Sequence, residues 1–195
     1  MTGEGGRAYM IPVMEADFDR YLLRIEKELD KEERLIKEKE KTDLGLGFSI
    51  DVPKGFAPAR EHSADIYWSI NRPLAVWIRD GGRVGFSFQR VEGGRPEGLV
   101  KSGLLSFPKE IRRMLEQADG RTVFYGEGIT PKGIGWLEYK SFAEEKRVYQ
   151  LLCFFQAGGG DVLGSFYCSY EEYEKWRKVF FGMMQTVEMQ EGGEG

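Results

Sequence analysis

Histidine and cysteine are almost missing from this chain. Its 195 residues include one histidine, His62, and two cysteines, Cys153 and Cys168. The inventory excludes a structural zinc site built from the usual His and Cys ligands of one chain, and also any His-rich metal cluster. It equally excludes a disulfide-dense secreted scaffold. We therefore expect no metal and no other cofactor, and two reduced thiols.

Long apolar runs and an excess of basic charge are also missing. The longest apolar run, residues 151–155, is far shorter than the roughly 20 residues that span a bilayer. The polar, glycine-containing residues 1–7 are not followed by the apolar stretch of a signal peptide. The formal net charge of −4 gives no general electrostatic basis for binding nucleic acid or an anionic membrane. We expect a cytoplasmic protein.

Glycine, in contrast, is plentiful, with 26 residues. Residues 126–135 and 158–160 are glycine-rich, which invites a phosphate-loop interpretation. A phosphate loop leads from a strand into the N-terminus of a helix, whereas each of these loops leads into another strand pattern. We interpret 126–128, 131–133 and 158–161 as separators between strands, that is, as hairpin turns.

Residues 17–41 have the spacing of an amphipathic helix, and Gly45 and Gly47 are expected to end it. Its apolar stripe thins after Leu29, and most residues of 26–41 are charged. The stripe could pack on its own domain or dock a partner, including a second copy of the chain. The residues of a possible homodimer contact are Phe18, Leu22, Ile25 and Leu29.

Alternating and continuous apolar patterns predict an antiparallel sheet. Strands are expected at 48–52, 74–78, 84–91, 121–125, 135–139, 148–156 and 162–167. Asp80-Gly81-Gly82 is a strong hairpin signal, because glycine supplies the positive φ that tight turns need. If the 158–161 turn is central, Cys153 and Cys168 lie on one face, displaced by two residues.

Two more helices are predicted. Residues 96–118 read as helical in two pieces, the second beginning at Ser106 with Pro108 in its first turn. Residues 169–172 have the capping-box pattern of a helix start. The stripe after it is expected to be buried core rather than an exposed seam, and consists of Tyr173, Trp176, Phe180, Met183 and Val187.

Residues 148–155 are apolar at nearly every position, so the side chains on both faces of this strand are apolar. Both faces of the sheet must therefore be covered. The fold class is therefore α+β. We expect an antiparallel β-sheet covered by helices on both faces, an α/β/α sandwich, with an extra N-terminal charged helix. The expected organisation is a flexible tail at 1–16, the charged helix at 17–44, a single domain at 45–189 and a flexible tail at 190–195.

One segment, residues 65–73, is not explained by packing alone. It combines large amphipathic rings, an amide and a guanidinium, the side chains typical of recognition surfaces: Tyr67, Trp68, Asn71 and Arg72. A rigid turn with one buried ring is the alternative.

His62 lies beside Ser63 and Asp65, but neighbours in one short loop cannot aim at one another as a catalytic triad does. We interpret it as an exposed loop histidine.

The order of these features resembles a known superfamily. The residues that carry the resemblance are 67–73 (YWSINRP), 84–88 (VGFSF), 134–140 (IGWLEYK), Val148-Tyr149 and 164–168 (GSFYC) followed by a Trp-containing helix. Over about residues 48–189 the chain resembles uncharacterised bacterial relatives of the PsbP/DcrB superfamily. The resemblance implies a PsbP-like antiparallel sheet between helices and no shared catalytic residues. It implies relatives that bind Ran, support photosystem II, lie in bacterial envelopes or chaperone secretion effectors.

These observations favour a non-enzymatic cytoplasmic protein-binding domain, an adaptor or a chaperone. Its expected partner is another protein, bound through Tyr67, Trp68, Asn71 and Arg72. The alternative is a small-molecule or lipid-binding module with a pocket between sheet and helix. An enzyme that uses carboxylates and Arg72 is the third and weakest hypothesis.

Overall fold

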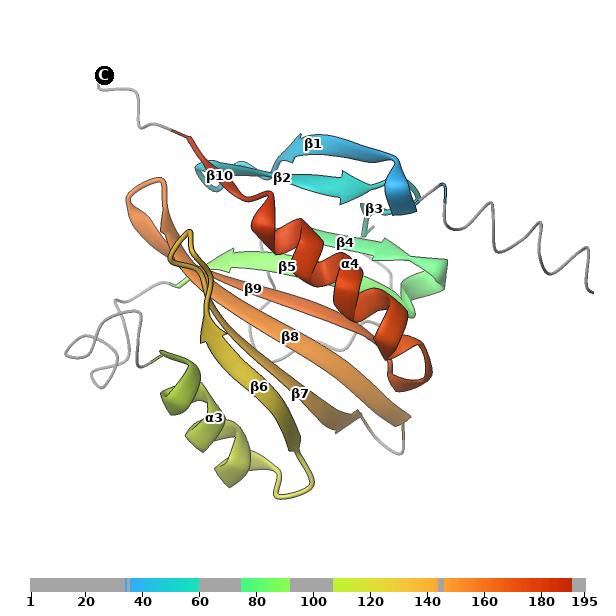
Figure 1. The fold of residues 1–195 in the computed structure, drawn as a ribbon, viewed down its shortest axis with the longest axis vertical. Coiled ribbons are helices and arrows are strands. Elements are labelled where there is room, and N and C mark those ends of the chain that lie inside the picture. Colours follow the sequence, from blue (N-terminus) through green and yellow to red (C-terminus); the bar gives the residue numbers. More distant parts are fainter. Residues whose placement is uncertain (1–33, 35, 60–74, 92–106, 144–145, 191–195) are drawn as a thin grey trace, which may run out of the picture.

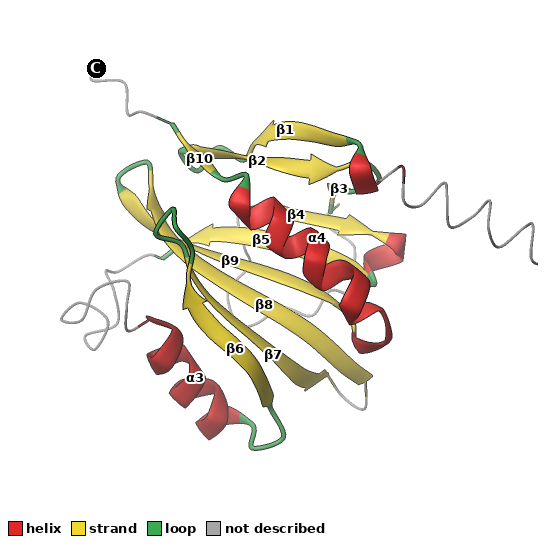
Figure 2. Ribbon diagram, viewed as in Figure 1, coloured by secondary structure: helices red, strands yellow, loops and turns green. Residues whose placement is uncertain are grey.

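The computed structural model describes residues 34, 36–59, 75–91, 107–143 and 146–190. Within these ranges the strands form two antiparallel sheets (Figure 1). Helix α4 (Tyr173–Gln185) crosses one face of the larger sheet, and helix α3 (Phe107–Ala118) lies beside its far edge (Figure 2). The described part of the chain is therefore mostly antiparallel sheet with two helices.

The larger sheet has seven strands and the smaller has three. The larger sheet runs in the order β3 (Ala57–Pro58), β4 (Ala75–Arg79), β5 (Val84–Arg90), β9 (Gly160–Ser169), β8 (Lys146–Ala157), β7 (Gly135–Ala143), β6 (Val123–Ile129). The smaller sheet runs in the order β1 (Lys39–Asp43), β2 (Phe48–Pro53), β10 (Glu188–Met189). Each strand predicted within the described ranges is present, although several boundaries differ.

The turn between β8 and β9 consists of two glycines. Gly158 and Gly159 both have positive φ, 53° and 76°, as a tight primed hairpin requires. This turn is shorter than the predicted one, so the strand register differs. Cys153 pairs with Gly164, and Cys168 pairs with Tyr149. The two cysteines share a face as expected, but they are displaced by four residues along the strands rather than two.

Helix α4 supplies the main core. Trp176, Phe180 and Met183 are fully buried and Val187 is 2% exposed, so the prediction that this stripe is core is confirmed for four of its five residues. The fifth, Tyr173 at the start of the helix, is only partly buried. The Phe180 ring lies 5.2 Å from that of Phe166 on β9. Such packing fills the space between α4 and the sheet with aromatic rings.

The opposite face of the larger sheet is also apolar. Phe154 is 2% exposed and packs there against Ile111 of α3. Val148 and Tyr167 form a separate buried group with Val76 and other residues of the β3–β4 side. Helix α3 contacts mainly β6 and β7, where Arg112 lies over the Phe124 ring, and reaches β8 through Ile111. The expectation that helices cover the whole of both faces therefore stays a prediction.

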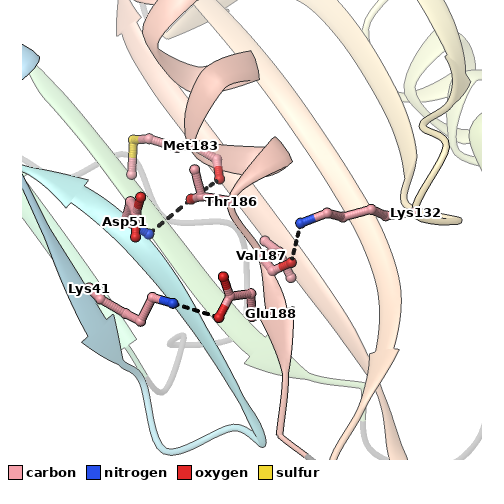
Figure 3. A network of polar contacts seen from close by, with 7 residues as sticks. All are labelled: Lys41, Asp51, Lys132, Met183, Thr186, Val187 and Glu188. Carbon is pink, nitrogen blue, oxygen red and sulfur yellow. Dashed lines mark hydrogen bonds and ion pairs between the residues drawn. The ribbon is translucent and has the colours of Figure 1, made fainter.

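The end of α4 fastens the smaller sheet to the rest of the domain. Figure 3 shows two hydrogen bonds across this junction: the Asp51 N–H donates to Thr186 Oγ1 at 2.9 Å, and Lys132 donates to the Val187 carbonyl oxygen at 2.9 Å. Within the smaller sheet itself, Lys41 of β1 donates to Glu188 of β10. A further link is made by Arg90 of β5, whose guanidinium donates to the carbonyl oxygens of Leu46 and Ala157. The Arg90 guanidinium therefore links the β1–β2 turn of the smaller sheet to the end of β8 in the larger sheet.

The predicted charged helix at 17–44 is wrong over its last part. Residues 34, 36 and 37 are helical, but Lys39–Asp43 is strand β1, paired along its length with β2. Pairing with the open edge of β2 satisfies the backbone hydrogen bonds that a helix would otherwise provide, and so overrides local propensity. Gly45 and Gly47 form the β1–β2 turn, with φ of 70° and 79°, rather than a helix stop. The earlier part of the predicted helix, including the predicted homodimer contact, lies outside the described residues.

Two smaller predictions are also wrong. Residues 126–128 are not a separator but part of β6, because Gly126 and Gly128 leave room for the Trp136 ring: a Cβ would lie 3.3 Å and 3.0 Å from its atoms. The capping box does not form, since Ser169 donates to Glu171 and the 3₁₀ turn η2 (Tyr170–Glu172) precedes α4. The first piece of the predicted helix at 96–118, with Ser106, lies outside the described residues.

Candidate functional site

The site predicted from the sequence is not described by the structure. Tyr67, Trp68, Asn71 and Arg72 all lie in the range 60–74, outside the described residues. His62 lies in the same range. The residues below were found from the structure instead.

Four tyrosines gather at one end of α4, and we call them the tyrosine cluster: Tyr125 of β6, Tyr149 of β8, Tyr170 of η2 and Tyr173 of α4. Tyr170 and Tyr173 are stacked, with centroids 4.9 Å apart. Tyr125 lies nearly parallel to both, at 6.4 Å and 6.2 Å. The Tyr149 ring lies 5.9 Å from that of Tyr173 and is fully buried, whereas 42% of Tyr125 is exposed. The cluster therefore leads from the core to the surface.

Two phenol groups of the cluster, those of Tyr125 and Tyr149, are neutral hydrogen-bond donors. Tyr125 donates to the Tyr170 hydroxyl at 2.8 Å. Burial, followed by this hydrogen bond, raises the pKa of Tyr125. Burial and then the charge of the Glu138 carboxylate raise the pKa of Tyr149. Both rings thus present uncharged O–H groups at physiological pH.

A buried ion pair supports the cluster from below. Glu138 of β7 is 3% exposed, and its carboxylate accepts two hydrogen bonds from Arg177 of α4, at 2.7 Å and 2.8 Å. It also accepts from the Tyr149 hydroxyl at 2.9 Å. The hydrogen bonds to Glu138, which outweigh burial, raise the pKa of Arg177 above its already high ordinary value. This bidentate geometry fixes α4 against the sheet.

These residues line an open depression of about 460 Å³. Its walls are Tyr125, Tyr149 and Tyr173, and its charged residues are Glu138, Glu174, Arg177 and Lys178. Two cations lie over the ring of Tyr170 just outside it: Lys140 Nζ at 5.3 Å and the Arg147 guanidinium at 5.5 Å. Cation and aromatic ring attract one another in this arrangement. Tyrosine and arginine together are the residues enriched where proteins bind one another.

The two cysteines are poor candidates for nucleophilic chemistry. Both are buried and unpaired, and burial raises the pKa of each thiol to about 12. A thiol that stays protonated is a weak nucleophile. In the described ranges no three His, Cys, Asp or Glu side chains gather as metal ligands. None of the helices there is long and apolar enough to cross a membrane.

Sequence reasoning missed the tyrosine cluster because its members come from four elements. One signal was available: Glu138 lies between Leu137 and Tyr139 in an otherwise apolar strand, where a carboxylate needs a buried partner. The other signal was Tyr170 with Tyr173, three residues apart at a helix start. Neither indicates that Tyr125 joins them.

Comparison with known proteins agrees with the architecture. No protein-family model matches the chain, and no curated protein matches it. The antiparallel sheet crossed by a C-terminal helix is a PsbP-like fold, so the resemblance predicted from the sequence is confirmed at the level of the fold.

The solution structure of cyanobacterial PsbP (CyanoP) from Synechocystis sp. PCC 6803 matches with a TM-score of 0.52 and 8% identity, over 77% of this chain and 92% of that chain. The Ran-binding protein Mog1p of Saccharomyces cerevisiae matches with a TM-score of 0.48 and 12% identity, over 78% and 95%. LpqN of Mycobacterium tuberculosis, described as involved in cell envelope biogenesis, matches with a TM-score of 0.38 and 11% identity, over 79% and 91%.

Proposed function

We propose that the chain is a non-enzymatic protein-binding domain of the cytoplasm, an adaptor or a chaperone-like protein. The observation that carries the proposal is the tyrosine cluster, which is stacked, partly exposed and anchored to the buried Glu138–Arg177 pair. Rings that are already held in place lose little conformational entropy when a partner binds them.

The filled interior favours this proposal over a lipid or small-molecule site between sheet and helix. The rings of Phe166, Trp176 and Phe180 occupy the space below α4, and all three are fully buried. The depressions around the tyrosine cluster are open and at the surface. A surface of this shape suits the side chains of a protein partner.

Free thiols support the cytoplasm as the compartment. Cys153 and Cys168 are both unpaired, which is the state that a reducing compartment maintains. The homodimer through Phe18, Leu22, Ile25 and Leu29 stays a separate prediction. It is tested by the molar mass of the purified chain in solution, with Leu22→Glu as the disrupting variant.

Affinity capture from native lysate tests the proposal with matched variants. Val123 and Tyr125 lie on the same strand and are each 42% exposed, so Val123→Ala controls for Tyr125→Ala. Truncating a central tyrosine costs about 2 kcal/mol of binding or more, so we expect Tyr125→Ala to retain the partner at least about 30-fold more weakly. The control should retain it fully.

Equal retention by the wild type and both variants would mean that the tyrosine cluster does not bind the partner. Trp68→Ala and Arg72→Ala, measured in the same way, test the sequence-predicted site independently. Circular dichroism of each variant verifies that it is folded.

A further inference from the structure

A second depression lies next to the tyrosine cluster, and we call it the cationic pocket. It has a volume of about 530 Å³ and is lined by Arg83, Lys146, Arg147, Val148, Tyr167, Cys168, Ser169 and Glu171. Strand pairing brings these residues together, because Val84 pairs with Cys168 and Val148 pairs with Ser169. The pocket therefore lies where β5 and β8 begin and β9 ends, beside η2 (Figure 1).

The pocket is positively charged on a protein that is not. Three of its lining side chains are cations and one is a carboxylate, whereas the whole chain has a net charge of −4. Lys146 and Arg147 form no ion pair with any residue in the described ranges, and Arg83 reaches Glu172 only at 4.0 Å. Cations that have no ion pair among the described residues are candidates to bind an anionic ligand.

Arg147 joins the cationic pocket to the tyrosine cluster. Its guanidinium lies 5.5 Å from the centre of the Tyr170 ring, and Tyr170 stacks on Tyr173. A guanidinium at this distance from an aromatic ring is attracted to it, and its planar fork of N–H groups can donate two hydrogen bonds to one carboxylate. Tyr170 thus contacts one lining residue of each depression: Tyr173 on the aromatic side and Arg147 on the cationic side.

We propose that the cationic pocket binds the carboxylates of an acidic segment of a partner polypeptide, whose apolar side chains rest on the tyrosine cluster. This inference rests on the proposed function and specifies the chemistry of the partner. A polypeptide fits better than a nucleic acid, because the surface offers a few cations in a depression and not the long basic stripe that tracks a phosphate backbone. Adjacent aromatic and cationic areas match a segment with both acidic and apolar side chains.

Binding of two synthetic peptides tests the inference on the full chain. The first probe is a fluorescent peptide of alternating glutamate and phenylalanine, and the second has glutamine in place of glutamate. We expect the glutamate peptide to bind about 10-fold more tightly or better. We also expect its affinity to fall several-fold between about 50 mM and about 300 mM salt, because salt screens exposed charges.

Two double variants that remove the same charge provide the matched comparison. Lys146→Gln/Arg147→Gln changes the cationic pocket, whereas Lys109→Gln/Arg113→Gln removes two exposed cations from α3. We expect the first to weaken binding of the glutamate peptide about 5- to 10-fold and the second to leave it within about 2-fold. Neither should change binding of the glutamine peptide.

Three results would overturn the inference: equal affinity for both peptides, equal affinity of the two double variants, or binding of poly(U) or phosphatidylglycerol vesicles in preference to the glutamate peptide. Tyr125→Ala distinguishes this failure from failure of the proposed function. If Tyr125→Ala weakens binding of both peptides while the double variants do not differ, the tyrosine cluster binds protein and the cationic pocket does not contribute.

Discussion

Replacing Arg177 with alanine tests the ion pair that supports the tyrosine cluster. The substitution removes two hydrogen bonds, of 2.7 Å and 2.8 Å, from a Glu138 carboxylate that is 3% exposed. Among the described residues, the Tyr149 hydroxyl, at 2.9 Å, is then the remaining hydrogen-bond donor to that carboxylate. An uncompensated buried charge is the main cause of the expected loss in stability.

The magnitude follows from the burial of the two partners. Breaking a fully buried pair costs about 3–5 kcal/mol of unfolding free energy. Because 45% of the Arg177 side chain is exposed, water can solvate part of the vacated position, so we expect about 2–3 kcal/mol. For a domain of this size each kcal/mol lowers Tm by about 2–4 °C, which gives a decrease of about 4–12 °C.

Urea unfolding followed by tryptophan fluorescence measures this loss, with the fully buried Trp176 among the reporters. Glu138→Gln in the Arg177→Ala background removes the unpaired charge, so the double variant should be more stable than the sum of the single effects predicts, by about 1–2 kcal/mol. Arg113→Ala, an exposed position on α3, is the control and should stay within about 0.5 kcal/mol of the wild type.

A loss below about 0.5 kcal/mol for Arg177→Ala would refute the reasoning, because it would mean that the carboxylate is well solvated without its partner. Strictly additive single and double variants would refute it as well. In either case the pair could not be what holds the tyrosine cluster in place.

Three further predictions concern one residue of the core and the two thiols. Gly164→Ala should lower the free energy of unfolding by about 1–3 kcal/mol in the same assay, because the new Cβ would lie 2.4 Å from Phe88 Cε1 and 2.5 Å from Cys153 Sγ. Gly120→Ala is the control and should be nearly neutral, because a Cβ there would lie in open space. Equal effects of the two substitutions would contradict the packing argument. Burial raises the pKa of Cys153 and Cys168 to about 12 from an ordinary value of 9.0, so iodoacetamide at about pH 8 should alkylate the unfolded chain much faster than the native one. The pKa of each thiol is higher in the folded chain than in the unfolded chain, so burial of the neutral thiols contributes to stability fully below pH 9.0, and this contribution is lost as the pH rises toward about 12. The midpoint of urea unfolding should therefore fall over this range of pH. A midpoint that rises would be evidence against the argument.

The sheet could be predicted from the sequence because its signals are local. Alternation at 48–52 and the continuous apolar run at 148–155 appear in β2 and β8, and the Asp80-Gly81-Gly82 turn joins β4 to β5. The burial of one face of α4 could be predicted in the same way, because large apolar side chains at helical spacing are favourable where that face packs in the core. Side-chain period alone was sufficient for these elements.

Strand β1 shows where local signals fail. The charged residues Lys39, Glu40 and Lys41 continue a pattern of opposite charges that favours a helix, and no apolar alternation marks them as strand. They become a strand because β2 offers an open edge, and Lys41 reaches Glu188 from there. The energy that decides between the two structures comes from residues far away in the chain, so a local pattern could not contain it.

The sequence by itself determined the fold class of this protein, an antiparallel sheet with glycines at its turns and a buried C-terminal helix. Only the tertiary structure decided the candidate site. Tyr125 and Tyr170 are 45 residues apart, and Glu138 and Arg177 are 39 apart, yet each pair is in hydrogen-bond contact. The spacing of residues along one element is fixed by its own geometry, whereas contact between elements depends on strand order and register, which arise only when the whole sheet forms.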